Sequence, residues 1–320
     1  MDSGESGEHA MNHIHRKSPF WSLAGPLLAY WGIQLAVQFI IQAFIQVPYM
    51  TEAYMKQFAS GNITDAEQAM ESYMSLIGPA IELVMKYEVE ITGAAALCTI
   101  PLTAILFRKD RKLEKDLGIG PAQRTPLKKY WMILVFGILG TVGVTCLSAM
   151  AQAVMYDEAY VSAAQSMYSA SFPVQVLALG IIVPAAEELM FRGIMFERYR
   201  ENRNFWYSAL WSSLFFSIMH TNTIQMVYSF LLGVLLSYLY ERFGSLRAPM
   251  LMHIVLNTGA LVFTEAGFFS WLAEDLLRMS LTVIVCAFIC SVMFVMIRQT
   301  VGEKKEDHSE KKEDSTNMFL

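Results

Sequence analysis

The chain has 320 residues, of which 54% are hydrophobic and 17% are charged, and its formal net charge at pH 7 is −5. A soluble domain carries about a quarter of charged residues, so this composition excludes an ordinary soluble enzyme. The apolar residues gather in blocks of roughly 17–27 residues, which is the length of helix that crosses a bilayer. We therefore predict an all-α, polytopic transmembrane helix bundle of about eight spans.

The ends of the chain and its cysteines add little chemistry. Residues 1–18 are polar and contain no short apolar run with a cleavage site, so we expect a cytoplasmic tail and no signal peptide. All four cysteines lie in apolar runs, where a free thiol behaves as a small hydrophobic group, and their spacing fits no metal motif.

The first predicted span, about Trp21–Val47, is followed by an acidic stretch, Pro48–Lys86. We interpret this stretch as an exported loop that contains an amphipathic helix near Thr64–Tyr87. Thr64, with Glu67 three residues later, has the pattern of a capping box at the start of that helix.

Seven further spans follow in the sequence. They are predicted at about Val89–Phe107, Tyr130–Met155, Val174–Phe196, Phe205–His220, Ile224–Tyr240, Ala248–Phe263 and Trp271–Ile297. Basic residues cluster before the first span and after the second, fourth, sixth and eighth, whereas the other loops almost lack them. Basic loops stay in the cytoplasm. The pattern therefore predicts a multi-pass protein of the cell membrane with both termini cytoplasmic, and it explains the basic loop 108–130 without a nucleic-acid partner.

Two adjacent acids, Glu187 and Glu188, lie inside the fourth predicted span. A charge at the centre of a bilayer costs at least ~2.5–3.5 kcal/mol on insertion scales, so these acids need a physical reason. Glu188 and Arg192 are four residues apart and share a helix face, which favours an ion pair. Glu187 points about 100° away and is left free to act as a general base.

A proline lies three residues before the first acid. Pro184 cannot donate a backbone hydrogen bond, so it frees the carbonyl of Gly180 and is expected to kink the helix. A kinked helix opens space that water can enter.

Two later spans carry imidazoles and an amide. His220 ends the fifth predicted span, and His253 and Asn257 share one face of the seventh. A histidine and an asparagine at this spacing offer two hydrogen-bond donors to one point, as stabilisation of an oxyanion requires. Taken singly, each group is also explained by a structural contact between helices, and the Glu–Arg pair by a structural ion pair.

Together these residues resemble the signatures of a known family. The three pieces are Glu187-Glu188-Leu-Met-Phe-Arg192, Phe216-Ser-Ile-Met-His220 and His253-Ile-Val-Leu-Asn257. They are similar to the E-E-x-x-x-R, F-x-x-x-H and H-x-x-x-[N/D] motifs of the CPBP (ABI) family, which includes type II CAAX prenyl endopeptidases and bacteriocin-processing or immunity proteins. The resemblance covers residues 174–258 and implies an eight-helix intramembrane protease.

The resemblance also implies roles for the residues. Glu187 would activate water, His220 would help to hold it, His253 and Asn257 would form the oxyanion hole, and Glu188 with Arg192 would support them. The implied substrate is a peptide or protein, extending in this family to a lipidated C-terminus, in contact with membrane lipid. The implied organisation is a tail (1–18), N-terminal transmembrane helices with the exported loop (19–170), a catalytic core (171–264), a last transmembrane helix (265–300) and a charged cytoplasmic tail (301–320).

Three alternatives stay open at this point. No metal or other cofactor is expected, but Glu187, His220 and His253 satisfy the ligand count of a catalytic zinc, although no H-E-x-x-H pattern is present. A non-catalytic immunity or scaffold protein would use the same groove to bind a partner. A proton-coupled transporter would use Glu187 as its proton site.

The depth of the motifs makes one further prediction. Counted from the cytoplasmic edge, Glu187 and His253 lie within ~15 Å of it, whereas His220 lies ~20 Å or more away. The three groups meet only if the helix of the fourth span continues into the cytoplasm, and we expect it to reach about Arg200.

Overall fold

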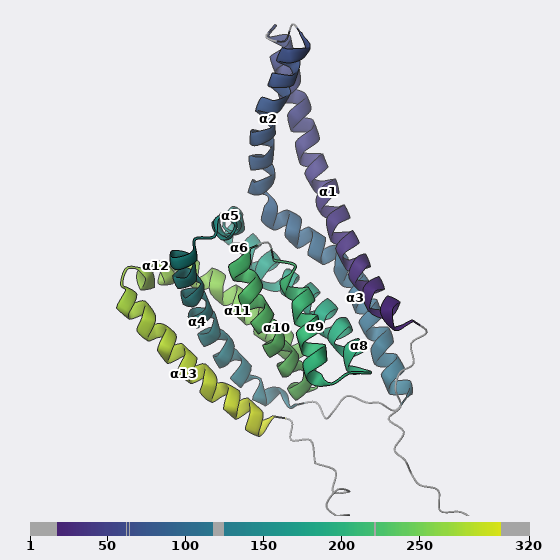
Figure 1. Ribbon diagram of the computed structural model, residues 1–320, viewed down its shortest axis with the longest axis vertical. Helices are drawn as coiled ribbons and strands as arrows, with labels where there is room; N and C mark the ends of the chain where they lie inside the picture. The colour runs from purple at the N-terminus through teal and green to yellow at the C-terminus, as the bar shows by residue number, and fades with distance from the viewer. Residues whose placement is uncertain (1–17, 62, 64, 118–124, 221, 302–320) are drawn as a thin grey trace, which may run out of the picture.

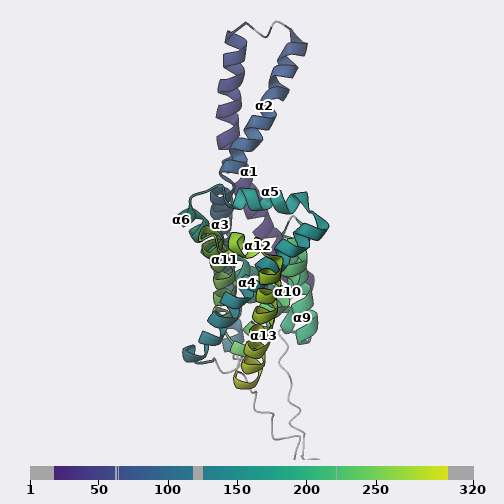
Figure 2. The same cartoon turned by 90° about the vertical axis from the view of Figure 1, so that its left-hand side faces the viewer.

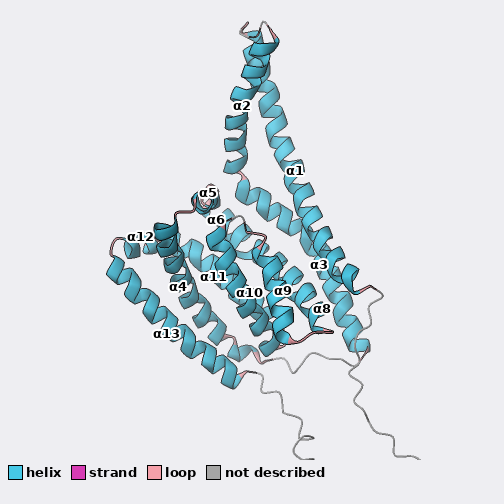
Figure 3. Cartoon of the chain, viewed as in Figure 1, coloured by secondary structure: helices cyan, strands magenta, loops and turns pink. Residues whose placement is uncertain are grey.

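The computed structural model describes residues 18–61, 63, 65–117, 125–220 and 222–301, and within them every regular element is a helix (Figure 3). The tails 1–17 and 302–320, which hold nearly all of the two expected terminal segments, lie outside the described residues. The elements are α1 (Pro19–Ala59), α2 (Ala66–Lys86), α3 (Glu88–Asp116), η1 (Leu127–Lys129), α4 (Trp131–Met155), α5 (Glu158–Met167), α6 (Phe172–Gln175), η2 (Val176–Ile182), α7 (Val183–Met190), η3 (Phe191–Phe196), α8 (Glu197–Arg200), α9 (Phe205–Ser217), α10 (Thr223–Phe243), α11 (Arg247–Glu265), α12 (Phe268–Ala273) and α13 (Leu276–Thr300).

Six helical stretches among the described residues are long and apolar enough to cross a membrane. They are Phe20–Ala59, Glu88–Asp116, Leu127–Met155, Phe172–Arg200, Thr223–Phe243 and Leu276–Thr300. The other two predicted spans correspond to α9, which has only 13 residues, and to α11, whose polar residues lower its hydropathy. The all-α, multi-pass architecture is therefore confirmed, with six full-length apolar helices and two helices packed among them.

The stretch Phe172–Arg200, made of α6, η2, α7, η3 and α8, is the centre of the bundle. It packs against α1 and α3 on one side, and against α9, α10 and α11 on the others. In Figure 1, α4 and then α13 form the outer layer on the left, and α1 and α3 lie side by side on the right. The rotated view in Figure 2 shows α5 lying across the end of the bundle instead of along its axis.

One end of the bundle collects the basic residues. The start of α1, the end of α3, the α8–α9 and α10–α11 turns and the end of α13 all lie at the lower end in Figure 1. The helix of the fourth span does reach Arg200, as predicted, and ion pairs anchor its last turn. Arg198 pairs with Asp110 at 2.7 Å and also donates to the carbonyl of Ser22, while Arg200 pairs with Glu241 at 2.8 Å. Three helices are thereby fastened at this end.

The segment that we predicted to be an exported loop differs from the prediction in its boundaries. The first helix does not end at Val47 but continues through Pro48 to Ala59, because a proline inside a helix removes one hydrogen bond without having to end it. The second helix begins at Ala66, and its cap is Asp65, whose side chain accepts from the N–H of Gln68 at 2.8 Å. The predicted capping residue Thr64 lies outside the described residues. Most of the expected loop is therefore a helical hairpin.

Candidate active site

The central helix changes its winding on both sides of the two acids. Val176–Ile182 and Phe191–Phe196 are π-helical, and the α-helical turns of α7 between them carry Glu187 and Glu188. π-helical turns widen a helix and are frequent at functional sites. The two acids themselves lie in α-helical turns, so their side chains point about 100° apart, as in a regular helix.

The backbone around the predicted kink is held by the neighbouring helix α11. Pro184 has no N–H, so it serves neither the carbonyl four residues before it nor the one five residues before it. Asn257 Nδ2 donates to the carbonyl of Leu179 at 3.1 Å, and Thr258 Oγ1 donates to that of Gly180 at 3.3 Å. The Gly180 carbonyl, which we expected to be free, thus accepts a hydrogen bond from Thr258. One amide N–H of Asn257 is already used to bond the Leu179 carbonyl.

A buried ion-pair network joins Glu188, Arg192 and His253. Glu188 and Arg192 are 0% exposed, and Arg192 Nη1 donates to Glu188 Oε1 at 2.9 Å, as the i, i+4 spacing predicted. The same oxygen of Glu188 lies 3.0 Å from Nδ1 of His253. Because an ionised carboxylate only accepts hydrogen bonds, this contact places a proton on Nδ1. Glu188 therefore orients the imidazole as well as pairing with the arginine.

Glu187 faces the other ring nitrogen. Its Oε2 lies 3.8 Å from Nε2 of His253, and it makes no ion pair with Arg192 among the described residues. This separation is too long for a direct hydrogen bond. A water oxygen at ~2.8 Å from each atom would bridge them.

Glu187, Glu188, Arg192 and His253 form a neutral set when one proton is shared between His253 and Glu187. Glu187 and Glu188 bring two negative charges, Arg192 brings one positive charge, and one more proton makes the set neutral. A net charge in an apolar interior is costly, so the neutral set is favoured. The proton then lies either on His253, which becomes an imidazolium facing the Glu187 carboxylate, or on Glu187 itself.

The ring of Phe216 links the second motif to this network. The Arg192 guanidinium lies 4.4 Å from the ring centroid, and the rings of His220 and His253 contact it edge-on at 5.4 and 5.7 Å. Phe216 therefore separates the two imidazoles and fixes their positions. His220 Nδ1 is buried and has no hydrogen-bond partner among the described residues.

Glycines allow the helices to approach the site closely. A Cβ built on Gly180 would lie 2.7 Å from Thr258 Oγ1, and one on Gly233 would lie 2.7 Å from Ser213 and 3.0 Å from Arg192 Nη2. Any larger side chain at these positions would push α11 or α10 away. The glycines thus set the distances across which the polar groups meet.

Several buried polar atoms near Arg192 are left unsatisfied within the described part of the chain. They are Glu188 Oε2, Arg192 Nε and Nη2, Ser213 Oγ and His220 Nδ1. Buried polar atoms are normally paired with protein or water. This cluster is consistent with a polar, hydrated site inside an apolar bundle.

The structure brings some of the predicted site residues into direct contact and keeps others apart. Glu187, Glu188, Arg192 and His253 form one cluster. His220 reaches it through Phe216, and Asn257 bonds to the backbone of the central helix. The contributions of Thr258, Ser213 and Gly233 were missed, because small residues between apolar neighbours give no distinctive signal in one sequence.

A zinc ion would need at least three ligand side chains grouped around one point. Among the residues that the structure describes, no three His, Cys, Asp or Glu side chains are grouped closely enough to hold a metal ion. His253 already uses Nδ1 to bond Glu188, so it has one nitrogen left for another partner.

Comparison with known proteins agrees with the motifs. Residues 169–259 match the family described as type II CAAX prenyl endopeptidase Rce1-like, which confirms the resemblance over that part of the chain. The chain is 26% identical over 111 residues to YdiL of Bacillus subtilis (strain 168), which is named as a candidate membrane peptidase, covering 35% of this chain and 46% of that protein.

A second relative comes from another bacterium. Over 93 residues the chain is 34% identical to an uncharacterized 24.3 kDa protein of Escherichia coli, covering 28% of this chain and 43% of that protein. The chain thus spans about half the length of the curated relatives that it matches. No solved structure matches it significantly.

Proposed function

We propose, from this family match and the geometry around His253, that the chain is an intramembrane endopeptidase that cuts a peptide bond with water activated by Glu187. The observation that carries the proposal is the division of labour between two adjacent acids. Glu188 is bound to Arg192 at 2.9 Å, whereas Glu187 lies 3.8 Å from His253 Nε2 without that arginine. One carboxylate is thus neutralised and the other keeps its basicity.

The reactive state has the mobile proton on His253. Glu187 then accepts a proton from a water, and the resulting hydroxide attacks the carbonyl carbon of the scissile bond. The imidazolium donates from Nε2 to the developing oxyanion, and Asn257 donates its second amide hydrogen. When the intermediate collapses, Glu187 passes its proton to the leaving amine, so the carboxylate is regenerated.

His220 acts as the second holder of the attacking water in this scheme. Its Nδ1 is buried without a hydrogen-bond partner among the described residues, and the ring of Phe216 contacts the imidazole edge-on. The site lies among apolar helices, so the substrate class is a peptide or protein segment that enters the membrane. The family description adds a prenylated C-terminal segment as the first substrate to try.

The test compares Glu187→Gln with Glu158→Gln, which changes an exposed glutamate of α5 in the same way. Purified full-length protein in nanodiscs is mixed with synthetic peptides that carry or lack a prenylated cysteine, and new termini are identified by mass spectrometry. We expect Glu187→Gln to lower kcat at least about 100-fold, as loss of a general base does, while Glu158→Gln leaves it unchanged. Equal cleavage by the two variants would contradict the proposal.

The zinc-dependent version of the reaction is separated by dialysis against a strong chelator. Activity that survives dialysis supports the water-activating carboxylate, and activity that is lost and then restored by zinc supports the metal enzyme. A wild-type protein that binds peptides without ever cutting them would instead point to the scaffold or immunity alternative.

A further inference from the structure

The outer part of α1, residues 48–59, and α2 form a hairpin that extends beyond the bundle. In Figures 1 and 2 it rises from the end opposite the basic turns, and α2 packs mainly on α1, with a smaller contact to α3. Because α1 has 41 residues, it is about 60 Å long, twice the thickness of the hydrocarbon core of a bilayer. The outer part of α1 and all of α2 therefore stand clear of the membrane.

One stripe of α2 is used to hold the hairpin together. Leu76, Ala80 and Val84 are buried at helical spacing, and Ser72 donates a hydrogen bond to Gln57 of α1. This stripe accounts for the packing between the two helices.

A second apolar stripe of α2 is exposed. Met70, Tyr73, Met74 and Ile81 are 63%, 50%, 58% and 50% exposed. At 100° per residue these four positions fall within an arc of about 100° beside the buried stripe. Near the outer end of α1, Met55 and Phe58 are likewise exposed, three residues apart. A water-facing hairpin with this much apolar surface is typical of a binding site.

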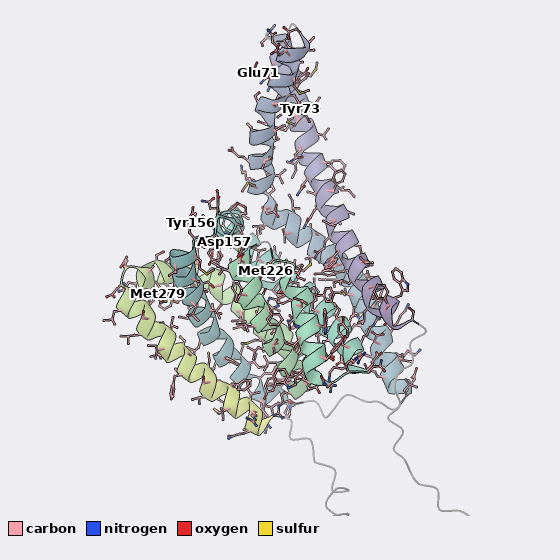
Figure 4. The ribbon with its side chains drawn as sticks, viewed as in Figure 1. Glu71, Tyr73, Tyr156, Asp157, Met226 and Met279 are labelled. Carbon is pink, nitrogen blue, oxygen red and sulfur yellow. The ribbon has the colours of Figure 1, made fainter. Side chains whose placement is uncertain are left out.

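The exposed stripe has an acidic edge. Glu67, Glu71 and Glu82 fall in the next arc of about 60° around α2. None of the three forms an ion pair within the described part of the chain, and the nearest pair on the hairpin, Glu52 with Lys56 at 2.6 Å, belongs to α1. Figure 4 labels Glu71 and Tyr73, which project from the upper part of the hairpin.

We propose that this face of α2 docks a cationic amphipathic helix of a partner, with its apolar side on the Met70–Ile81 stripe and its basic side along the Glu67–Glu82 edge. Grooves and stripes of this kind bind helices through anchors at i, i+3, i+4 and i+7, and methionines adapt to different side chains. The unpaired acids supply the charge complementarity that selects a basic partner.

The acidic edge of α2 also argues against a second copy of this chain as the partner that covers the exposed stripe. A second copy would carry the same acidic residues, so a contact between two of these faces would bring two acidic helices together and supply no basic side to pair with them. Like charges in such an arrangement repel. A bilayer is also excluded as the occupant, because the hairpin extends away from it. The segment lies outside the part that matches the family, so the proposal is independent of the cleavage reaction.

The test uses full-length protein in nanodiscs of zwitterionic lipid and a fluorescent 18-residue helix of leucine and lysine as the probe. Its counterpart, with glutamate in place of lysine, controls for apolar binding. Variant Glu67→Lys/Glu71→Lys/Glu82→Lys reverses the acidic edge. Variant Glu158→Lys/Glu265→Lys/Glu274→Lys changes the net charge equally at exposed positions on the same end of the bundle.

We expect the edge variant to bind the lysine probe at least tenfold more weakly than wild type and to prefer the glutamate probe. The control variant should behave as wild type. Tyr73→Ser/Met74→Ser should weaken both probes. Equal binding of the lysine probe by all proteins would overturn the proposal. So would a dimer, seen by mass photometry, that Tyr73→Ser/Met74→Ser converts to monomer, because a second copy would then cover the stripe.

Discussion

Removal of the Arg192 charge should expose how tightly the buried groups depend on one another. Arg192 is 0% exposed, bonds Glu188 at 2.9 Å and lies 4.4 Å from the Phe216 ring centroid. Arg192→Met keeps much of the volume but leaves Glu188 buried with only His253 to compensate it. Loss of one partner of a buried pair costs about 3–5 kcal/mol of unfolding free energy.

The double variant Glu188→Gln/Arg192→Met removes both charges. It should be clearly more stable than Arg192→Met, because no uncompensated carboxylate remains. The net charge of the buried site should also decide the activity of each variant. In Arg192→Met the two acids attract an extra proton, which disables Glu187 as a base. In Glu188→Gln the excess positive charge drives the proton off His253 and removes a donor to the oxyanion. The double variant restores neutrality and should cut faster than either single variant.

The measurement is a double-mutant cycle on the detergent-solubilised protein, with unfolding followed by far-UV circular dichroism during titration with SDS. Peptide cleavage is measured on the same samples. A coupling energy between the two positions of about 1–3 kcal/mol is expected for groups in direct contact. If the effects of the two substitutions simply add, in stability and in rate, then Glu188 and Arg192 are not a coupled pair and the charge balance argued for the site is wrong.

Two further substitutions test the packing and the anchoring of the site. Gly180→Ala places a Cβ 2.7 Å from Thr258 Oγ1, so it should lower the free energy of unfolding by about 1–3 kcal/mol and reduce cleavage by displacing α11. The control is Gly32→Ala, whose Cβ meets nothing within 4 Å. It should be neutral or slightly stabilising in the same unfolding assay. Asp110→Asn leaves Arg198 buried without its 2.7 Å ion pair and should lower the free energy of unfolding by about 3–5 kcal/mol. The kcat of the folded fraction should be unchanged, because the pair is remote from Glu187. A large loss of kcat would contradict that separation.

Local spacing allowed the strongest predictions from the sequence. The Glu188–Arg192 pair followed from positions four apart on a helix, and the extension to Arg200 followed from counting helical rise between three motifs. Hydropathy located the membrane helices, because a bilayer imposes length and apolarity on any helix that crosses it. These properties depend on neighbours in the sequence and need no tertiary contacts.

Properties that depend on tertiary contacts were missed. The bond from Glu188 to His253 joins residues 65 apart, and no pattern within either helix reveals it. The predicted boundary of the first span at Val47 was wrong, because the helix continues through Pro48 to Ala59. The engagement of Asn257 with the Leu179 carbonyl depends on the π-helical winding before Pro184, which periodicity analysis does not detect.

The adjacency of the two acids gives the motif its physical meaning. Neighbouring residues on a helix point about 100° apart, so a single arginine four residues after the second acid pairs with that acid and leaves the first unpaired. His253 then lies between them, with Nδ1 on Glu188 and Nε2 toward Glu187. A lone glutamate could not both orient the imidazole and remain available as a base. Two adjacent glutamates with one arginine separate these tasks within a single turn, and the site stays neutral in an apolar bundle.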